Sequence, residues 1–501
     1  MKFILSHKLK LDKEHENLLI PYFEDQDQER RFQKIFSGTQ FEKIIPDIFK
    51  TTIKIDVKSG NKEVLIPAGV GTVQFTFLSL GEMEKFERHT LIDVFSVFAM
   101  EARQDTQILM EGLEFPGYTP QIALETMIQG MYQGGYVFQK DMLKKLSDTS
   151  LFKIRDILSG EKKGNTFTFI SAEAIQENMD SAILTGQCTN YARMLGDLPN
   201  NYLHVQEFAG YLKELATFYN LPCEILGNHE LEELHSGGIL GVNAGSKEEA
   251  NLITLYYEGT KEAPITALIG KGVMFDSGGY HLKSINSMDG MKYDMCGAAN
   301  MAAAFEIAVR HKSKKNILLI IPAVENLIGT DACKMGDVLT TMSGTTVEVY
   351  NTDAEGRLIL CDALTYAIKK GATALIDLAT LTYSCQRALG NNIAGIYANN
   401  EDFLEAFVEK ALEKNEKIWR LPLDKEYHAL LYRSQTADLI NYAPDFDGGA
   451  NVAACFLEEF VDNIPWIHLD IVGPAVNRLD NKKRPLGATG VMTASIAAFL
   501  Q

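Results

Sequence analysis

The feature that most constrains the fold of this chain is a regular alternation of short apolar runs and helical segments in its second half. Apolar runs of strand length separated by helices form parallel strands joined by crossover helices. The pattern therefore predicts an α/β fold whose C-terminal part is a mainly parallel mixed sheet flanked by helices. The expected strands are Leu252–Tyr257, Ile265–Gly270, Ile317–Val324, Thr346–Tyr350, Ala372–Leu378 and Trp466–Ile471. The expected helices are Ala298–His311, Arg357–Lys369, Phe403–Lys414 and Ala450–Phe460.

The N-terminal part also mixes strand-like and helix-like segments and is expected to form a smaller α/β domain. The polar stretch Ser159–Asn165 marks the boundary, so we expect one domain over residues 1–165 and a second over residues 166–501. A chain of 501 residues has room for two such domains. The segments expected in this part are the strands Lys50–Val57, Glu63–Pro67 and Val73–Leu80 and the helices Glu82–Glu101 and Ile122–Gln133. After the boundary, we expect a short strand over Phe167–Ile170 and a long helix over Ala172–Met194.

The net charge of the chain argues against two classes of partner. The chain has 48 Lys and Arg residues against 66 Asp and Glu residues, a formal net charge of −18. Such an acidic chain is a poor partner for nucleic acid or for an anionic membrane surface. No apolar run approaches the roughly 20 residues of a membrane span, and the N-terminus lacks the pattern of a secretory signal. We therefore expect neither a membrane nor a nucleic acid among the partners.

The cysteines indicate a reducing compartment. There are seven, none of them in a C-x-x-C motif, and several lie inside apolar runs. An odd number of scattered, apolar-flanked cysteines is typical of reduced thiols. We therefore expect a cytoplasmic protein.

Acidic side chains follow the expected strands at three places. Asp276 lies in the Gly-rich segment Ile269–Lys283, Asp294 lies in MKYDMC before an Ala-rich helix, and Asp353 and Glu355 lie in NTDAEGRL after TVEVY. Sites of parallel sheets lie beyond the carboxyl ends of the strands, so these four carboxylates are expected to converge. Asp353 and Glu355 are two residues apart, which places them on one side of an extended backbone.

Four converging carboxylates repel one another unless cations neutralise them. Two divalent cations would do so, and an oxygen-rich ligand set suits Zn, Mn, Mg or Co. Other site classes fit poorly. The chain has no H-E-x-x-H motif, no G-x-S-x-G elbow, and Ile265 where a phosphate-binding loop would need glycine before Gly-Lys.

Three segments, IGKGVMFDSGGYHLK, MKYDMCGAA and NTDAEGRLILCDALTYA, resemble the leucyl aminopeptidase (cytosol aminopeptidase) family, peptidase family M17. The similarity runs from about Asp197 to the C-terminus, and NTDAEGRL matches the family's signature octapeptide in full. The resemblance implies a metallo-aminopeptidase that hydrolyses N-terminal residues from peptides. It implies two divalent metals, with Zn or Mn favoured, and a bridging water as nucleophile.

The resemblance also implies roles for individual residues. The metal ligands would be Lys271, Asp276, Asp294, Asp353 and Glu355, with Asp276 and Glu355 bridging the ions. Lys271 can ligate only as a neutral amine, which a nearby dication favours by depressing its pKa. The catalytic residues would be Lys283, which stabilises the oxyanion, and Arg357. Arg357 would hold a bicarbonate ion as general base, or contact the gem-diolate directly.

The pocket for the first substrate residue maps onto Met291, Thr380, Tyr383, Val472 and Ala475. The family commonly has glycine where this chain has Tyr383. If Tyr383 points inward, we expect large Leu- or Phe-type residues to be disfavoured; if it packs outward, the pocket keeps its size.

The remaining expectations concern the substrates, the oligomeric state and alternative functions of the protein. The resemblance implies peptide substrates with a free N-terminus and a homohexamer, and we assign the N-terminal domain a regulatory or oligomerisation role. A metal-dependent dipeptidase or cysteinylglycinase stays open. A DNA-binding regulator is disfavoured by the charge of −18. A catalytically dead scaffold is disfavoured because every expected ligand and both catalytic positions are present.

Overall fold

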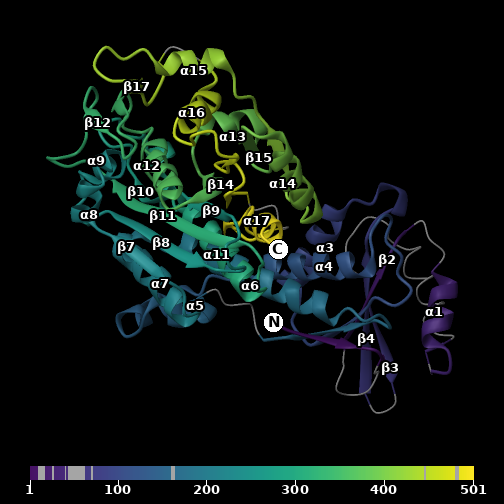
Figure 1. Cartoon of the computed structure of the whole chain (residues 1–501). Helices are drawn as coiled ribbons and strands as arrows, with labels where there is room; N and C mark the ends of the chain where they lie inside the picture. The colour runs from purple at the N-terminus through teal and green to yellow at the C-terminus, as the bar shows by residue number, and fades with distance from the viewer. Residues whose placement is uncertain are drawn as a thin grey trace. The chain divides into compact units, whose positions relative to one another are not determined.

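A computed structural model describes residues 1–9, 17–24, 28–39, 41–42, 62–68, 71–158, 164–444, 447–479 and 484–501. The chain forms two compact units (Figure 1). The first consists of Met1–Val137, Glu161–Gln187 and Asp480–Pro485, and the second of Phe138–Gly160, Cys188–Leu479 and Leu486–Gln501. The strand expected at Lys50–Val57 and most of the polar stretch Ser159–Asn165 lie outside the described residues.

The second unit is built on a nine-stranded mixed sheet. The strands β18, β14, β9 and β11 are mutually parallel, whereas β8, β7 and β15 join antiparallel neighbours, so the prediction of a mainly parallel mixed sheet is confirmed. The order is β16 (Ile418–Arg420), β15 (Ala394–Ala398), β18 (Trp466–Asp470), β14 (Ala372–Ala379), β9 (Ile265–Gly270), β11 (Asn316–Asn326), β8 (Asn251–Tyr257) and β7 (Cys223–Leu226), with β10 (Gly272–Asp276) paired to β11.

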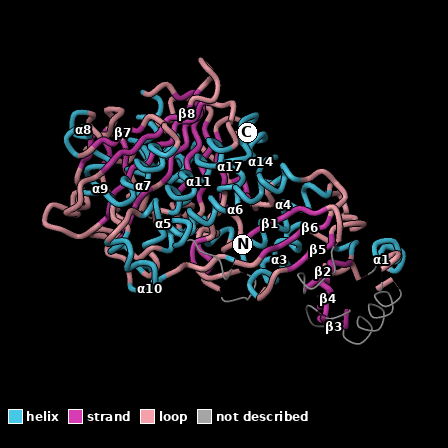
Figure 2. The backbone as a smooth tube through the Cα atoms, turned by 90° about the horizontal axis from the view of Figure 1, so that it is seen from below, coloured by secondary structure: helices cyan, strands magenta, loops and turns pink. Residues whose placement is uncertain are grey.

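Helices cover both faces of this sheet, as its apolar strands require. Every residue of β11 is buried, because helices pack against each side of it. On one face lie α9 (Gly237–Asn243), α12 (Gly356–Lys369) and α16 (Gly449–Glu458) around a shared apolar core. On the other lie α11 (Cys296–Arg310), α14 (Glu401–Glu413) and α17 (Thr493–Phe499). Figure 2 shows the strands running between these helices.

The described part of the second unit contains further helices. They are α5 (Leu151–Leu158), α7 (Val205–Phe218), α8 (Asn228–Glu233), α10 (Ile285–Met288), α13 (Tyr383–Leu389) and α15 (Lys425–Leu431). Of these, α7 also packs against β8 and β11.

The strand expected at Thr346–Tyr350 lies outside the main sheet, which corrects that prediction. It is β13 (Thr346–Glu348), in a small sheet with β12 (Val338–Thr340) and β17 (Leu439–Ile440). Its burial alternates, with Val347 buried and both neighbours half-buried, whereas a central parallel strand is buried on both faces. The loop expected after Gly270 contains β10, which carries Asp276 at its end.

The first unit is a smaller α/β structure, as predicted. Its sheet has the order β1 (Lys2–Ser6), β6 (Thr166–Ile170), β5 (Thr106–Leu109), β2 (Asn17–Tyr22), β4 (Gly71–Ser79) and β3 (Lys62–Ala68). All neighbours are parallel except β3 and β4. Helices α3 (Arg88–Glu101) and α4 (Pro120–Gly135) pack with one apolar cluster and α1 (Glu29–Phe36) with another. Strand β6 and the first half of α6 (Gln176–Asp197) belong to this unit, beyond the boundary expected at residue 165.

Two further findings bear on the setting of the protein. None of the described helices has the length and apolar character needed to cross a membrane. All seven cysteines lie in described segments and carry free thiols.

Candidate active site

The predicted site residues gather beyond the carboxyl ends of neighbouring strands. Lys271 follows β9, Asp276 ends β10, and Thr380 follows β14. Asp294 precedes α11, and Glu355 is the N-cap residue of α12. Because these strands are parallel and adjacent, their carboxyl ends bring the loops to one edge of the sheet.

Two lysine ammonium groups lie among the four carboxylates. Lys271 Nζ lies 2.8 Å from Asp294 Oδ1 and 2.7 Å from Glu355 Oε1, and it donates to the carbonyl oxygen of Thr380 at 2.9 Å. Lys283 Nζ lies 2.7 Å from Asp276 Oδ2 and also pairs with Asp353. Oxygens of Asp276, Asp353 and Glu355 lie within 4.8 Å of one another.

The electrostatics of the cluster follow from burial and from these pairs. Burial, the largest single effect, would lower the pKa of Lys271, but the carboxylates of Asp294 and Glu355 raise it above its ordinary value. Burial and the charge of Glu355 raise the pKa of Asp276, and burial raises that of Asp294 far above its usual range. Two ammonium groups face four carboxylates, so two negative charges stay uncompensated when all are ionised.

The donor set fits divalent cations. The buried oxygens Asp294 Oδ2 and Glu355 Oε1 lie 2.8 and 2.7 Å from the ammonium nitrogen of Lys271, and Asp353 Oδ1 pairs with Lys283. Among the described residues, these three oxygens have no hydrogen-bond partner besides those ion pairs. A carboxylate oxygen has more than one acceptor position, and converging carboxylates that outnumber their cationic partners suit Zn, Mn, Co or Mg.

Asp353 and Glu355 reach the cluster through a turn of the backbone and not through the extended conformation that was expected. Glu355 has helical backbone angles, φ −78° and ψ −36°, so the segment turns instead of running extended. The turn brings the start of α12 against Lys271, since a Cβ on Gly356 would lie 2.6 Å from Lys271 Cε. The prediction that the two acids share one site holds, but the extended geometry behind it is wrong.

Arg357 lies directly after these acids and is buried. Its Nη1 donates to the carbonyl oxygen of Asn441 at 2.9 Å, whereas its Nε has no hydrogen-bond acceptor among the described residues. Burial lowers the pKa of Arg357 to about 10, and the charges of Glu355, Tyr442 and Asp470 oppose that effect. The guanidinium thus keeps donor capacity for an anion.

Several residues that hold the cluster have no counterpart in the sequence prediction. Asn326 Nδ2 donates to Asp276 Oδ1 at 2.8 Å and to the carbonyl oxygen of Thr352 at 3.0 Å. Thr352 donates to the carbonyl oxygen of Gly278 and accepts from the His281 amide, which ties the two loops together. Asn326 ends β11, so its place at a carboxyl strand end could have marked it.

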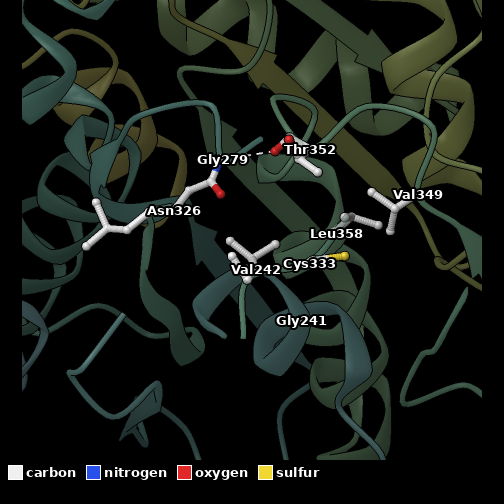
Figure 3. Close-up of a pocket in the computed structure, with 10 residues that line it drawn as sticks. Gly241, Val242, Gly279, Asn326, Cys333, Val349, Thr352 and Leu358 are labelled. Carbon is white, nitrogen blue, oxygen red and sulfur yellow. Dashed lines mark hydrogen bonds between the residues drawn. The ribbon is translucent and has the colours of Figure 1, made fainter. Parts of the chain in front are cut away.

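Figure 3 shows Asn326 and Thr352 on the wall of a small pocket. Most of its other lining side chains are apolar, among them Val242, Val349 and Leu358. The dashed line marks the hydrogen bond from Asn326 to Thr352.

Five residues were expected to line the pocket for the first substrate residue, and all five lie in described segments. Thr380 Oγ1 donates to Asp294 Oδ1 at 2.7 Å, and the carbonyl of Met291 accepts from the Asp294 amide. The Tyr383 ring lies 5.8 Å from Lys283 Nζ. Val472 follows β18, which pairs with β14 so that Asp470 lies opposite Ala379, beside Thr380. Ala475 is buried, and its amide bonds back to Ile471.

Comparisons with known proteins agree on one family. Residues 190–497 match the catalytic domain of the cytosol aminopeptidase family. The chain is 35% identical over 444 residues to a protein of Bacillus subtilis (strain 168) described as a probable cytosol aminopeptidase, a match that covers 88% of this chain and 87% of that protein. Two solved structures of the bottromycin maturation enzyme BotP, one in complex with Mn, are similar with a TM-score of 0.80 and 25% identity, covering 97% of this chain and 98% of theirs.

These matches confirm the resemblance drawn from the motifs. The family match includes every predicted ligand and catalytic position, and it spans more than half of the chain. The chain therefore belongs to the cytosol aminopeptidase family, peptidase family M17, and is an aminopeptidase of the metallo-exopeptidase class.

Proposed function

We propose that this enzyme removes N-terminal residues from peptides with two divalent metal ions held by Lys271, Asp276, Asp294, Asp353 and Glu355. The observation that carries the proposal is the buried cluster of four carboxylates, whose four negative charges are paired with only two ammonium groups among the described residues. A solved relative is a complex with Mn, which supports a divalent metal. When bound, the ions would polarise the scissile carbonyl and supply the attacking water at neutral pH.

The side chains around the cluster then have separate tasks. Lys283 stays an ammonium ion, since the carboxylates of Asp276, Glu355 and Asp353 raise its pKa against the effect of burial. It can donate to the carbonyl oxygen of the substrate as negative charge develops there. Arg357 offers an unpaired N–H beside the same cluster and can hold a bicarbonate ion or the developing diolate.

Restriction to the N-terminus follows from the same chemistry. A free, neutral α-amine can act as a ligand in such a site, whereas a blocked or internal amide nitrogen cannot. Coordination of that amine would hold the first residue in a single register and place its carbonyl carbon for attack. Peptides with an acetylated N-terminus should therefore not be cleaved.

The test compares metal content and activity in matched variants. Asp353→Ala and Glu355→Ala should each lose activity and bound metal while the protein still folds. Asp438→Ala is the control, because Asp438 is a carboxylate of the same unit whose partner is Thr346, on β13. Full activity in Asp353→Ala or Glu355→Ala would rule out the site.

We propose a cytoplasmic enzyme, which the seven free thiols support. We also propose a homohexamer, with a regulatory or oligomerisation role for the residues 1–165 domain; sedimentation as a monomer in the presence of metal would refute the hexamer. Assays on dipeptides against longer peptides would separate a dipeptidase from a general aminopeptidase.

A further inference from the structure

Asn441 reaches the loop of Asp353 and Glu355 from a distant part of the chain. It directly follows β17, which pairs with β13, the strand before that loop. Its side chain is completely buried. The backbone amide of Asn441 donates to the carbonyl oxygen of Glu348 at 3.1 Å, which continues the strand pairing as far as the start of the loop.

The side-chain amide of Asn441 makes four hydrogen bonds to the loop backbone. Its Oδ1 accepts from the amides of Tyr350 at 2.8 Å and Asn351 at 3.1 Å. Its Nδ2 donates to the carbonyl oxygens of Asn351 at 2.7 Å and Ala354 at 3.3 Å. Both lone pairs and both N–H bonds are therefore used, and only an amide of this length provides that set.

The main chain of Asn441 also holds the side chain of Arg357. Its carbonyl oxygen accepts from Arg357 Nη1 at 2.9 Å, while the Nε–H of Arg357 has no acceptor among the described residues. One residue thus sets the backbone on both sides of Asp353 and fixes one end of the guanidinium.

We propose that Asn441 is a positioning residue that holds Asp353 and Glu355 in the geometry needed to bind metal and sets the direction of Arg357. This inference rests on the proposed function, because it takes these acids as ligands. The loop also holds itself through an Ala354 amide to Asn351 carbonyl bond at 3.2 Å and an Asp353 amide to Asn351 Oδ1 bond at 2.8 Å. From outside the loop, Asn326 and the segment of Gly278 and His281 bond to Thr352, whereas Asn441 bonds to the residues on either side of it. Without Asn441, the loop carbonyls and amides lose buried partners and the loop relaxes.

The test uses Asn441→Ala with Asn316→Ala as a matched control. Asn316, also buried, accepts from the amides of Gly259 and Thr260 and donates to the carbonyl oxygen of Ala263, at the opposite end of β11 from the site. Both variants should lower the Tm. Asn441→Ala alone should lower kcat and the affinity for Mn²⁺ by about 10- to 100-fold, the range typical of groups that support metal ligands, with KM little changed.

Hydrogen exchange on metal-free protein provides a readout independent of catalysis. The amides of Tyr350 and Asn351 should exchange faster in Asn441→Ala than in wild type, and unchanged in Asn316→Ala. If Asn441→Ala does not fold, Asn441→Asp replaces it, since the acid keeps the acceptor but lacks the two donors. The carbonyl oxygens of Asn351 and Ala354 lose their donor there, so the losses of kcat and of Mn²⁺ affinity are expected. The amides of Tyr350 and Asn351 keep their acceptor in this variant, so the exchange measurement applies to Asn441→Ala alone.

The possible failures are distinguishable. Absence of Mn²⁺ binding by the wild-type protein would overturn the proposed function. Normal Mn²⁺ binding by wild type, with equal kcat and Mn²⁺ affinity in the Asn441 and Asn316 variants, would overturn the positioning role. Unchanged exchange at Tyr350 and Asn351 would overturn it as well, whatever the metal does.

Discussion

Tyr383, which the resemblance places in the pocket for the first substrate residue, lies beside Lys283. It begins α13, its hydroxyl donates to the carbonyl oxygen of Ser287 at 3.1 Å, and its side chain is 40% exposed. The ring centroid lies 5.8 Å from Lys283 Nζ. The ring therefore faces the loop that carries Lys283, at the edge of the proposed pocket.

We predict that Tyr383 disfavours large first residues. Wild type should have a higher kcat/KM for Ala-p-nitroanilide than for the Leu and Phe compounds, because the ring occupies space that glycine leaves open. Tyr383→Gly should reverse the order. A preference for Leu and Phe in both proteins would contradict this prediction.

Arg357 provides a second prediction at this scale. Arg357→Lys should lower kcat by about 100-fold, because lysine lacks the planar fork of donors and reaches one acceptor at a time. KM should change little if the contact forms mainly in the transition state. The Tm of the variant serves as its control, and a kcat near that of wild type in a folded protein would remove Arg357 from the mechanism.

Among the secondary-structure elements, α11 shows the closest approach of helix to sheet near the site. A Cβ on Gly297 would lie 2.2 Å from the carbonyl oxygen of Leu378 in β14, and one on Gly270 would lie 2.6 Å from Ala298 Cα. These contacts leave no room for a methyl group. The close contact sets the distance of α11 from the sheet. It therefore also sets the position of Asp294, which lies just before the helix.

We predict that Gly297→Ala lowers the free energy of unfolding by about 1–3 kcal/mol, the usual range for overpacking. The matched control is Gly210→Ala in α7, where a Cβ meets nothing within 4 Å and alanine should raise stability by about 0.5–1 kcal/mol. Urea unfolding measures both. If Gly297→Ala were as stable as wild type, the helix and the sheet would accommodate the extra methyl group at less cost than we infer.

A buried pair between β14 and β18 links stability to pH. His468 Nδ1 lies 2.5 Å from Asp377 Oδ1 on the paired strand, and both side chains are buried. Burial would lower the pKa of His468, but the charge of Asp377 raises it above its ordinary 6.5, with Asp470 adding to the rise and Arg357 opposing it.

We predict that stability from this pair is fully present below pH 6.5 and is lost as the pH rises through the higher folded-state pKa, because the unfolded state gives up its proton first. Asp377→Asn should lower the Tm at pH 6 more than at pH 9. Thermal unfolding between pH 6 and pH 9 measures how the effect of the substitution on the Tm changes with pH. An equal loss of Tm at both pH values would contradict the predicted direction.

Sequence patterns recover the apolar strands of the central sheet best. Strands β8, β9, β11, β14 and β18 were all expected close to their observed bounds. Strands β5 and β7 were not, because each has only four residues and carries a polar one, and β1 and β2 were not, because they flank the charged N-terminal segment. Val347 and its neighbours have strand propensity, but propensity does not determine which sheet a strand joins.

At the scale of the whole molecule, metal binding should stabilise the folded state by mass action. We predict that Mn²⁺ at 100 times its dissociation constant adds about 2.7 kcal/mol to the free energy of unfolding. The Tm should rise with Mn²⁺ concentration in wild type and stay constant in Asp276→Asn. A Tm that rises equally in both proteins would place the Mn²⁺ elsewhere.

The candidate site contains residues that local sequence predicts and one residue whose role depends on long-range folding. Its proposed ligands sit in short motifs at strand ends, so local sequence and strand order together predict that they converge. Asn441 bonds to a loop some 90 residues earlier in the chain and belongs to no motif. Its role depends on β17 pairing with β13, a long-range contact that the periodicity of neither segment encodes.

The ammonium groups of Lys271 and Lys283 have a consequence for how metal binding depends on pH. They pair with all four carboxylates, so a metal ion bound there would replace lysine as their counterion. If Lys271 ligates the ion as proposed, it has to give up a proton, and the surrounding carboxylates raise its pKa. We therefore expect the affinity for metal to fall as the medium becomes more acidic.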